Sequence, residues 1–132
     1  MKKFLVVLVL MFIAAGCSSA GAHHKELEKT LDSELQNEQL KEMDLNDYTE
    51  FEWDEAYIFP PYTTEASMEK QTGIKLEDPS GMESRDDINL IVFTHEGAFT
   101  NYVEISRKHA DISSGGKKHL TPHSPTITIT HH

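Results

Sequence analysis

A run of twelve apolar residues at positions 4–15, directly after two lysines, limits what the rest of this chain can fold into. A stable membrane-spanning helix needs about 20 such residues, and a basic start before a short apolar run is typical of a cleaved export signal. The run ends in two alanines and is followed by Gly16 and Cys17. Cys17 is the only cysteine of the chain. With no second cysteine the exported part forms no internal disulfide, so it has to fold by burial of apolar side chains alone.

Small residues directly before a cysteine resemble the export signal of bacterial lipoproteins. The resemblance implies a signal peptide over residues 1–16 and a Cys17 thiol that receives a diacylglyceryl group and acyl chains such as palmitate. Ala14 is a departure, because leucine is usual at that position. At ~0.8 kcal/mol per buried CH₂, two or three acyl chains would anchor the protein on the extracytoplasmic side of the cell membrane or envelope. The alternative is a plain secretory signal that leaves Cys17 as a stray thiol.

Length and charge narrow the class of protein further. Removal of residues 1–16 leaves 116 residues, enough for one small domain and a tether, since about 100 residues are needed to bury a useful core. Loss of Lys2 and Lys3 with the signal lowers the formal net charge from −10 to −12. Nucleic acid is therefore not an expected partner. Twelve of the 22 acidic residues lie between Glu26 and Glu55, a segment that an anionic membrane surface would repel.

The segment after Cys17 predicts a spacer and then a helix. Residues 18–24 are small or polar, and a helix is predicted over residues 25–43, where Leu27, Leu31 and Leu35 recur every four residues. The stripe is narrow, so a solvated stalk helix and a helix packed on the domain both stay open. We expect a lipid-anchored spacer and stalk helix over residues 17–46 and the folded domain over residues 47–132.

An aromatic segment follows the predicted helix. Phe51, Trp53, Tyr57 and Phe59 alternate with mainly polar neighbours, which predicts a strand over residues 51–59 with one buried aromatic face. Such a stripe is more often core than ligand-binding box. The two prolines at positions 60 and 61 end the pairing, because neither has an N–H to donate.

The second half predicts a short helix, a hairpin and a last strand. Thr63 or Thr64 can cap the helix, and Gly73 suits its left-handed end. Residues 88–93 and 99–105 predict a hairpin with Gly97 at positive φ.

The last strand, near the C-terminus, is expected to point Ile127 and Ile129 inward. The order of elements predicts an α+β domain with a small, mainly antiparallel sheet and one covering helix.

One phrase resembles a known group of proteins. Residues 53–63 read WDEAYIFPPYT, and an apolar hairpin, Arg107, Asp111 and a short last strand follow. This is similar to small uncharacterised bacterial lipoproteins that share a phrase like WDxxYxFxPYT, and the likeness covers about residues 48–130. Pro60, where glycine is often met, and the histidines of the tail depart from that pattern. The resemblance implies no established activity.

The residues do not assemble a catalytic site. Cys17 is expected to carry lipid, and no serine lies in a Gly-x-Ser-x-Gly elbow. Asp54 and Glu55 are adjacent, so on a strand they point to opposite faces and cannot act as a carboxylate pair. No glycine loop for phosphate is present either. We expect a protein that is not an enzyme and has no cofactor.

Eight histidines raise the question of a metal. His119 and His123 are the weak candidates for ligands, but Pro122 argues against the helix that would place both on one face. A solvated loop and tail with incidental histidines is the expected arrangement, and a weak transition-metal site is the alternative.

Partner contact is expected at Tyr62, Asp54 and Arg107, where Arg107 is expected to pair with Asp54 or Glu104. The sequence thus indicates a lipid-anchored, non-catalytic module that binds an unidentified protein at the cell envelope. Two alternatives stay open. One is a surface lipoprotein that captures metal with its C-terminal histidines, and the other is an immunity or inhibitor lipoprotein whose acidic face attracts a basic partner.

Overall fold

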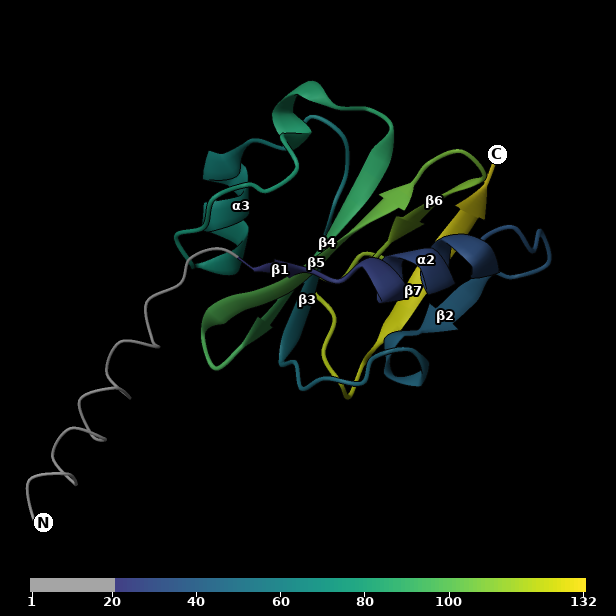
Figure 1. Ribbon diagram of the computed structural model, residues 1–132, viewed down its shortest axis with the longest axis horizontal. Coiled ribbons are helices and arrows are strands. Elements are labelled where there is room, and N and C mark those ends of the chain that lie inside the picture. The colour runs from purple at the N-terminus through teal and green to yellow at the C-terminus, as the bar shows by residue number, and fades with distance from the viewer. Residues whose placement is uncertain (1–20) are drawn as a thin grey trace, which may run out of the picture.

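A computed structural model describes residues 21–132 of the chain (Figure 1). The expected signal over residues 1–16 and the lipid site at Cys17 lie outside the described residues. Within residues 21–132, no helix is long and apolar enough to cross a membrane.

The described residues form two sheets, two α-helices and two short 3-10 helices. The bounds are β1 (Ala22–His23), α2 (Lys25–Glu34), β2 (Glu42–Asp44), η2 (Leu45–Asp47), β3 (Glu55–Phe59), α3 (Glu65–Thr72), η3 (Met82–Ser84), β4 (Ile88–His95), β5 (Ala98–Ser106), β6 (Ala110–Ser113) and β7 (Thr126–His131). Sheet A has the strand order β1-β5-β4-β3, and sheet B has the order β2-β7-β6. All pairs are antiparallel except β1 with β5. The predicted α+β class with mainly antiparallel pairing is confirmed, but two sheets replace the single one that was expected.

Sheet A is the middle layer, and both of its faces are buried (Figure 1). One face packs against α2 and sheet B, in a cluster that includes Phe93 and Val103. The other face packs against α3, whose Met68 lies in a second cluster with Leu90 and Val92. Two helices therefore cover opposite faces of sheet A, where one covering helix was expected.

Helix α2 is part of this core. It ends at Glu34, well before residue 43, and Leu27, Leu31 and Leu35 are buried against sheet A. His24 caps the N-terminus of the helix, because its ring Nδ1 accepts a hydrogen bond from the N–H of Leu27 at 3.1 Å. Of the two placements left open for this helix, the structure shows the packed one. The packed domain consequently begins before residue 47, the boundary expected from the sequence.

Helix α2 also closes the edge of β5. The carboxylates of Glu28 and Asp32 accept hydrogen bonds from the backbone N–H groups of Glu104, at 2.7 Å, and Ser106, at 3.1 Å. Four residues along a helix rise about 6 Å and two residues along a strand rise about 6.6 Å, so the two spacings match. Carboxylates of α2 thus occupy strand N–H groups that would otherwise be free to pair with another chain.

The carboxylate of Asp32 gives a stability prediction. Burial raises the pKa of Asp32 and outweighs the opposing hydrogen bond from Ser106. A raised pKa in the folded state means that the fold loses stability as this group ionises with rising pH. Asp32→Asn keeps an acceptor for Ser106 without the charge, so at neutral pH it should be at least as stable as the wild type. Asp32→Ala leaves the N–H without that acceptor and should cost about 1–2 kcal/mol.

Urea unfolding at neutral and acid pH checks this prediction. The advantage of Asp32→Asn should shrink as the pH falls through the raised pKa, because the wild-type carboxyl is then neutral as well. Equal destabilisation by asparagine and alanine would show that the charge of Asp32, not its acceptor oxygen, supports the edge of β5.

The aromatic segment departs from its prediction. Strand β3 begins at Glu55, so Phe51 and Trp53 precede it. They pack on the α2 side of sheet A, whereas Tyr57 and Phe59 lie on the α3 side. The prediction of one buried aromatic face was wrong, because the chain changes phase at Glu55 and the sheet buries both faces.

Other local predictions are confirmed. Thr64 caps α3 and Gly73 ends it in a left-handed conformation. The hairpin turn is Glu96-Gly97 with positive φ at both residues, the pattern of a type I′ turn. Ile127 and Ile129 of β7 are buried.

Candidate functional site

The register of sheet A separates the three residues expected to contact a partner. Strand β3 begins opposite Thr94 and ends opposite Leu90, so Asp54 lies at the end of the sheet that carries the β4–β5 turn. Tyr62 follows the other end of β3, and Arg107 follows the last residue of β5 at that same end. Eight steps along β5 at about 3.3 Å separate the two ends by roughly 26 Å. The structure thus brings Tyr62 and Arg107 to one end and places Asp54 at the other.

Tyr62 is the most unusual of these residues. Its backbone has φ 66°, the left-handed region that favours glycine, and its side chain is 62% exposed. Among the described residues it is the one large hydrophobic side chain that is exposed. A proline followed by a residue at positive φ is the pattern of a type II turn, where glycine or asparagine is preferred in the position that Tyr62 occupies. A left-handed conformation costs such a residue about 1–2 kcal/mol.

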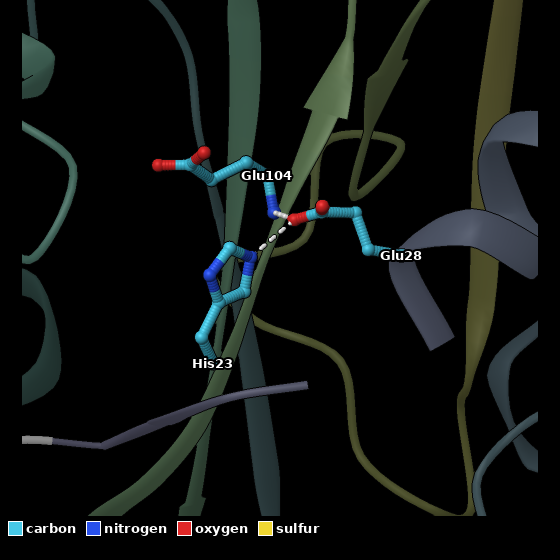
Figure 2. Close-up of side chains that lie close together, drawn as sticks. All are labelled: His23, Glu28 and Glu104. Atoms are coloured by element: carbon cyan, nitrogen blue, oxygen red, sulfur yellow. Dashed lines mark hydrogen bonds and ion pairs between the residues drawn. The ribbon is translucent and has the colours of Figure 1, made fainter. Parts of the chain in front are cut away.

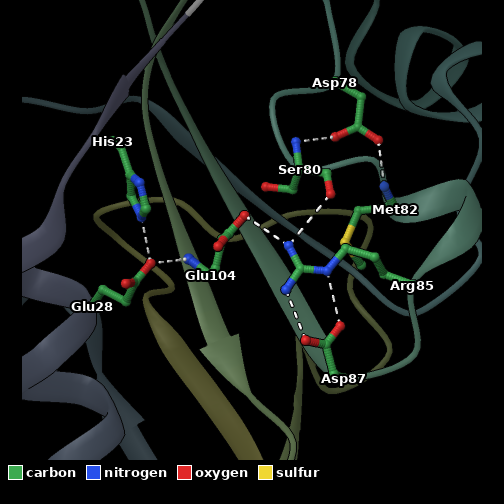
Figure 3. Close-up of polar contacts among 8 residues, drawn as sticks. All are labelled: His23, Glu28, Asp78, Ser80, Met82, Arg85, Asp87 and Glu104. Carbon is green, nitrogen blue, oxygen red and sulfur yellow. Dashed lines mark hydrogen bonds and ion pairs between the residues drawn. The ribbon is translucent and has the colours of Figure 1, made fainter.

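Hydrogen bonds to a neighbouring loop hold Tyr62 in this conformation. The N–H of Tyr62 donates to the carbonyl oxygens of Met82, at 2.8 Å, and Arg85, at 3.3 Å. The carboxylate of Asp78 in turn accepts the N–H groups of Ser80 and Met82, which folds the loop before η3 (Figure 3).

Arg85 ties this loop to sheet A (Figure 3). Its guanidinium makes two hydrogen bonds to Asp87, at 2.8 and 2.9 Å, and one to Glu104 of β5 at 3.2 Å. The hydrogen bonds to Asp87 are the main cause that raises the pKa of Arg85, and the same pair lowers the pKa of Asp87. The carbonyl groups that accept from Tyr62 are therefore fixed to the sheet through Arg85.

Arg107 pairs differently from the expectation. Its guanidinium donates to both carboxylate oxygens of Asp111 and to the carbonyl of Asp86 at 2.6 Å. Pairing with Asp54 or Glu104 was wrong, because Asp54 lies at the far end of the sheet and Glu104 is held by Arg85. The hydrogen bonds to Asp111 chiefly raise the pKa of Arg107. Tyr62 donates its N–H to the carbonyl of Arg85 and Arg107 donates to the carbonyl of the next residue, Asp86, so Tyr62 and Arg107 lie on one surface, which we call the Tyr62 surface.

The opposite end of sheet A carries an acidic groove of about 450 Å³. Phe51 and Trp53 line it together with Asp54 and His95. The ring nitrogens of His95 lie 3.3 Å from Asp54, 3.4 Å from Glu52 and 3.5 Å from a carboxylate oxygen of Glu96.

The carboxylate of Asp54 also accepts the backbone N–H of Glu96 at 2.6 Å, and this bond, more than His95, lowers the pKa of Asp54. Among the described residues no serine hydroxyl hydrogen-bonds to a histidine.

The C-terminal histidines have separate neighbours. His119 lies 3.0 Å from Glu55, His131 contacts the carbonyl of Leu40 at 2.7 Å, and His132 lies 3.5 Å from Asp111. His123 is exposed. Within residues 21–132, no group of three or more close ligand atoms includes His119 or His123. The geometry gives the expected weak metal candidates no common centre.

Three possible ligands do meet near the N-terminal strand (Figure 2). One ligand atom from each of His23, Glu28 and Glu104 lies within 4.8 Å of the others. One oxygen of Glu28 already accepts from the ring of His23, at 2.6 Å, and from the backbone N–H of Glu104. The carboxylate of Glu104 is turned toward Arg85 instead (Figure 3). A cation would have to displace these contacts and lie beside the guanidinium of Arg85. The three residues instead hold β1, α2 and β5 together.

Sequence reasoning found Tyr62 but missed the residues that position it. The prolines before Tyr62 could have indicated a type II turn and hence its positive φ. Arg85 and His95 had no such signal, because the contacts that tie them to other strands, with Glu104 and Glu52, join residues far apart in sequence.

Comparison of the chain with protein families, with curated proteins and with solved structures gave no match. A function for this chain therefore has to be inferred from its sequence and from the geometry of residues 21–132.

Proposed function

We propose that the protein is held by lipid on Cys17 at the extracytoplasmic side of a bacterial cell membrane or envelope, and that it binds another protein there without catalysis. The sequence pattern before Cys17 and the likeness of residues 48–130 to small bacterial lipoproteins support the location. The observation that carries the binding function is Tyr62, a strained residue whose ring is exposed.

Strain and exposure together favour binding over a structural role. Glycine or asparagine would fit the backbone of position 62 without cost, and the exposed ring contributes little to the core. Residues held in sparsely populated conformations cluster at functional sites, where the surrounding structure over-determines them. Here the surrounding structure is the loop that Asp78 and Arg85 fix to sheet A.

The neighbour of Tyr62 indicates the chemistry of the contact. Tyrosine and arginine are enriched among the residues that dominate the energy of protein interfaces. The charge of Arg107 is met by Asp111 and by the exposed Asp86, so the Tyr62 surface has no unpaired positive charge from Arg107 and presents mainly the phenol ring. The partner should therefore offer an apolar or aromatic pocket for the ring, with an acceptor for the hydroxyl.

Site-specific photo-crosslinking in living cells tests this function. A photoreactive phenylalanine at position 62 should give one discrete adduct of higher mass, whereas the same group at the exposed residue Glu77 should not. No adduct, or the same adducts from both positions, would contradict the proposal. An adduct from position 52 alone would instead favour the acidic groove, and with it an inhibitor that recognises a basic partner.

Substitution of Tyr62 should move stability and binding in opposite directions. Tyr62→Gly removes the backbone strain and the ring, so the domain should become up to about 1 kcal/mol more stable while partner affinity falls at least tenfold. Tyr62→Phe keeps the ring and should retain most of the affinity. Thermal melts and a binding titration with the cross-linked partner measure the two effects. Unchanged affinity in Tyr62→Gly would remove this residue from the interface.

A further inference from the structure

Strand β1 fixes the direction in which the chain enters the domain. Ala22 pairs with Asn101 and His23 with Tyr102, and the two strands are parallel. Followed backward from Ala22, the chain therefore runs along β5 toward Ala98 and the β4–β5 turn. Gly21 agrees with this course, because a Cβ there would clash with the ring of Phe99. The described chain thus starts toward the turn end of sheet A (Figure 1).

The entry is held firmly although β1 has only two residues. The ring of His23 stacks on Tyr102 with centroids 4.7 Å apart and hydrogen-bonds to Glu28 (Figure 2). The N–H of His24 donates to the carbonyl of Tyr102 at 3.0 Å, and its ring caps α2. The chain is consequently part of the packed domain from Ala22 onward.

The tether before this entry is short. Five peptide steps join Cys17 to Ala22, and at no more than about 3.6 Å per step they reach at most about 18 Å. Since α2 packs on sheet A, the helix adds nothing to this reach. Ala22 lies opposite Asn101, about 10 Å along β5 from Ala98 and about 17 Å from Ser106, so a tether that leaves toward Ala98 reaches the far end only by reversing its direction.

We propose that the tether holds the domain upright on the membrane, with the β4–β5 turn facing the bilayer and the Tyr62 surface pointing away from it. The proposal rests on the proposed lipid anchor at Cys17. It presents Tyr62 and Arg107 to partners outside the membrane and leaves the acidic groove on the side of the lipid. Between the two candidate surfaces, it selects the Tyr62 surface as the one that a folded partner can reach.

Charge at the turn opposes the approach of this end to anionic lipid, so the orientation depends on the tether and not on electrostatic attraction. Glu52 and Glu96 are exposed there and Asp54 is half-exposed. Anionic lipid headgroups repel these carboxylates at low ionic strength, and the repulsion is screened by salt.

Fluorescence quenching on the acylated full-length protein tests the orientation. Because acylation blocks Cys17, a cysteine introduced at exposed Ala98 or exposed Lys108 is the only free thiol and accepts one fluorophore. In vesicles of phosphatidylethanolamine and phosphatidylglycerol with quencher-bearing headgroups, the probe of Ala98→Cys should be quenched several-fold more than that of Lys108→Cys. A flexible insertion of about 20 Gly and Ser residues before Gly21 should abolish the difference, since its reach is about 25 Å.

Each other outcome overturns the orientation. Equal quenching of the two probes, or stronger quenching at position 108, contradicts it while leaving the anchor intact. A difference that survives the inserted spacer shows that the short tether is not its cause. Mass spectrometry that finds no acyl group on Cys17 removes both the anchor and the orientation. Binding of a partner through Tyr62 is measured without these probes. A failure of the proposed binding function is therefore distinguished from a failure of the proposed orientation.

Discussion

Replacement of Trp53 by alanine is expected to lower the free energy of unfolding by about 3–5 kcal/mol. The indole is 5% exposed and meets the edge of Phe93 with ring centroids 5.7 Å apart. Its Nε1–H donates to the hydroxyl of Thr49 at 3.2 Å. A domain of this size has a total stability of about 5–15 kcal/mol, so the loss is enough to unfold a domain near the lower end of that range.

Circular dichroism with urea and thermal unfolding measures this effect. Trp53→Phe is the matched control, because it keeps an apolar ring beside Phe93 and gives up only the hydrogen bond and part of the volume. It should lose clearly less stability than Trp53→Ala. A melt of Trp53→Ala that coincides with the wild type would show that the indole is not part of the core, and the acidic groove that it lines would then gain weight as a binding site.

The fold was predictable where the signal is local. The type I′ turn at Glu96-Gly97 and the left-handed cap at Gly73 follow from backbone preferences of a few adjacent residues. The double burial of sheet A was also visible in principle, since residues 88–93 read INLIVF with no regular alternation. The alternation of residues 51–59 led to the wrong prediction of one buried aromatic face, because Trp53 precedes β3 and packs on the α2 side of sheet A.

Features that depend on distant pairing could not be predicted from the sequence. Residues 42–44 continue a helical composition, yet Met43 pairs with Ile127 of β7 and is buried with it. Similarly, the sealing of β5 by α2 joins residues more than 70 positions apart. Helix propensity and periodicity describe a single segment, whereas these contacts are decided by what the rest of the chain leaves exposed.

The candidate site likewise has a part that the sequence predicted and a part that depends on distant contacts. Tyr62 drew attention through the two prolines before it, but its strained backbone depends on carbonyl groups of Met82 and Arg85. The pairing of Arg107 was misassigned because the direction of β5 places Asp54 at the opposite end of the sheet. Asp111 and Asp54 carry the same charge, so only the strand topology shows which of them pairs with Arg107.

Replacement of Cys17 by serine should abolish the incorporation of a fatty-acid probe and, where the signal is still cleaved, membrane association. Serine lacks the thiol that receives the diacylglyceryl group, and without two or three acyl chains no part of residues 21–132 supplies a helix that could hold the protein in a membrane. The variant should be released into the medium or stay unprocessed. Ser18→Ala changes the neighbouring residue without removing the thiol and should keep both the label and the membrane fraction.

The fold itself should not change in Cys17→Ser, because packing begins at Ala22 and residues 21–132 contain no cysteine. Fluorescence of Trp53, the single tryptophan, and the thermal melt should therefore match those of the acylated protein. The released domain should also bind the partner of Tyr62 in solution with unchanged intrinsic affinity, since that surface lies roughly 26 Å from the turn end of sheet A. Persistent probe incorporation in Cys17→Ser would refute the lipid site. Loss of partner binding in the correctly folded, released domain would instead place the interface at the membrane side, near the acidic groove.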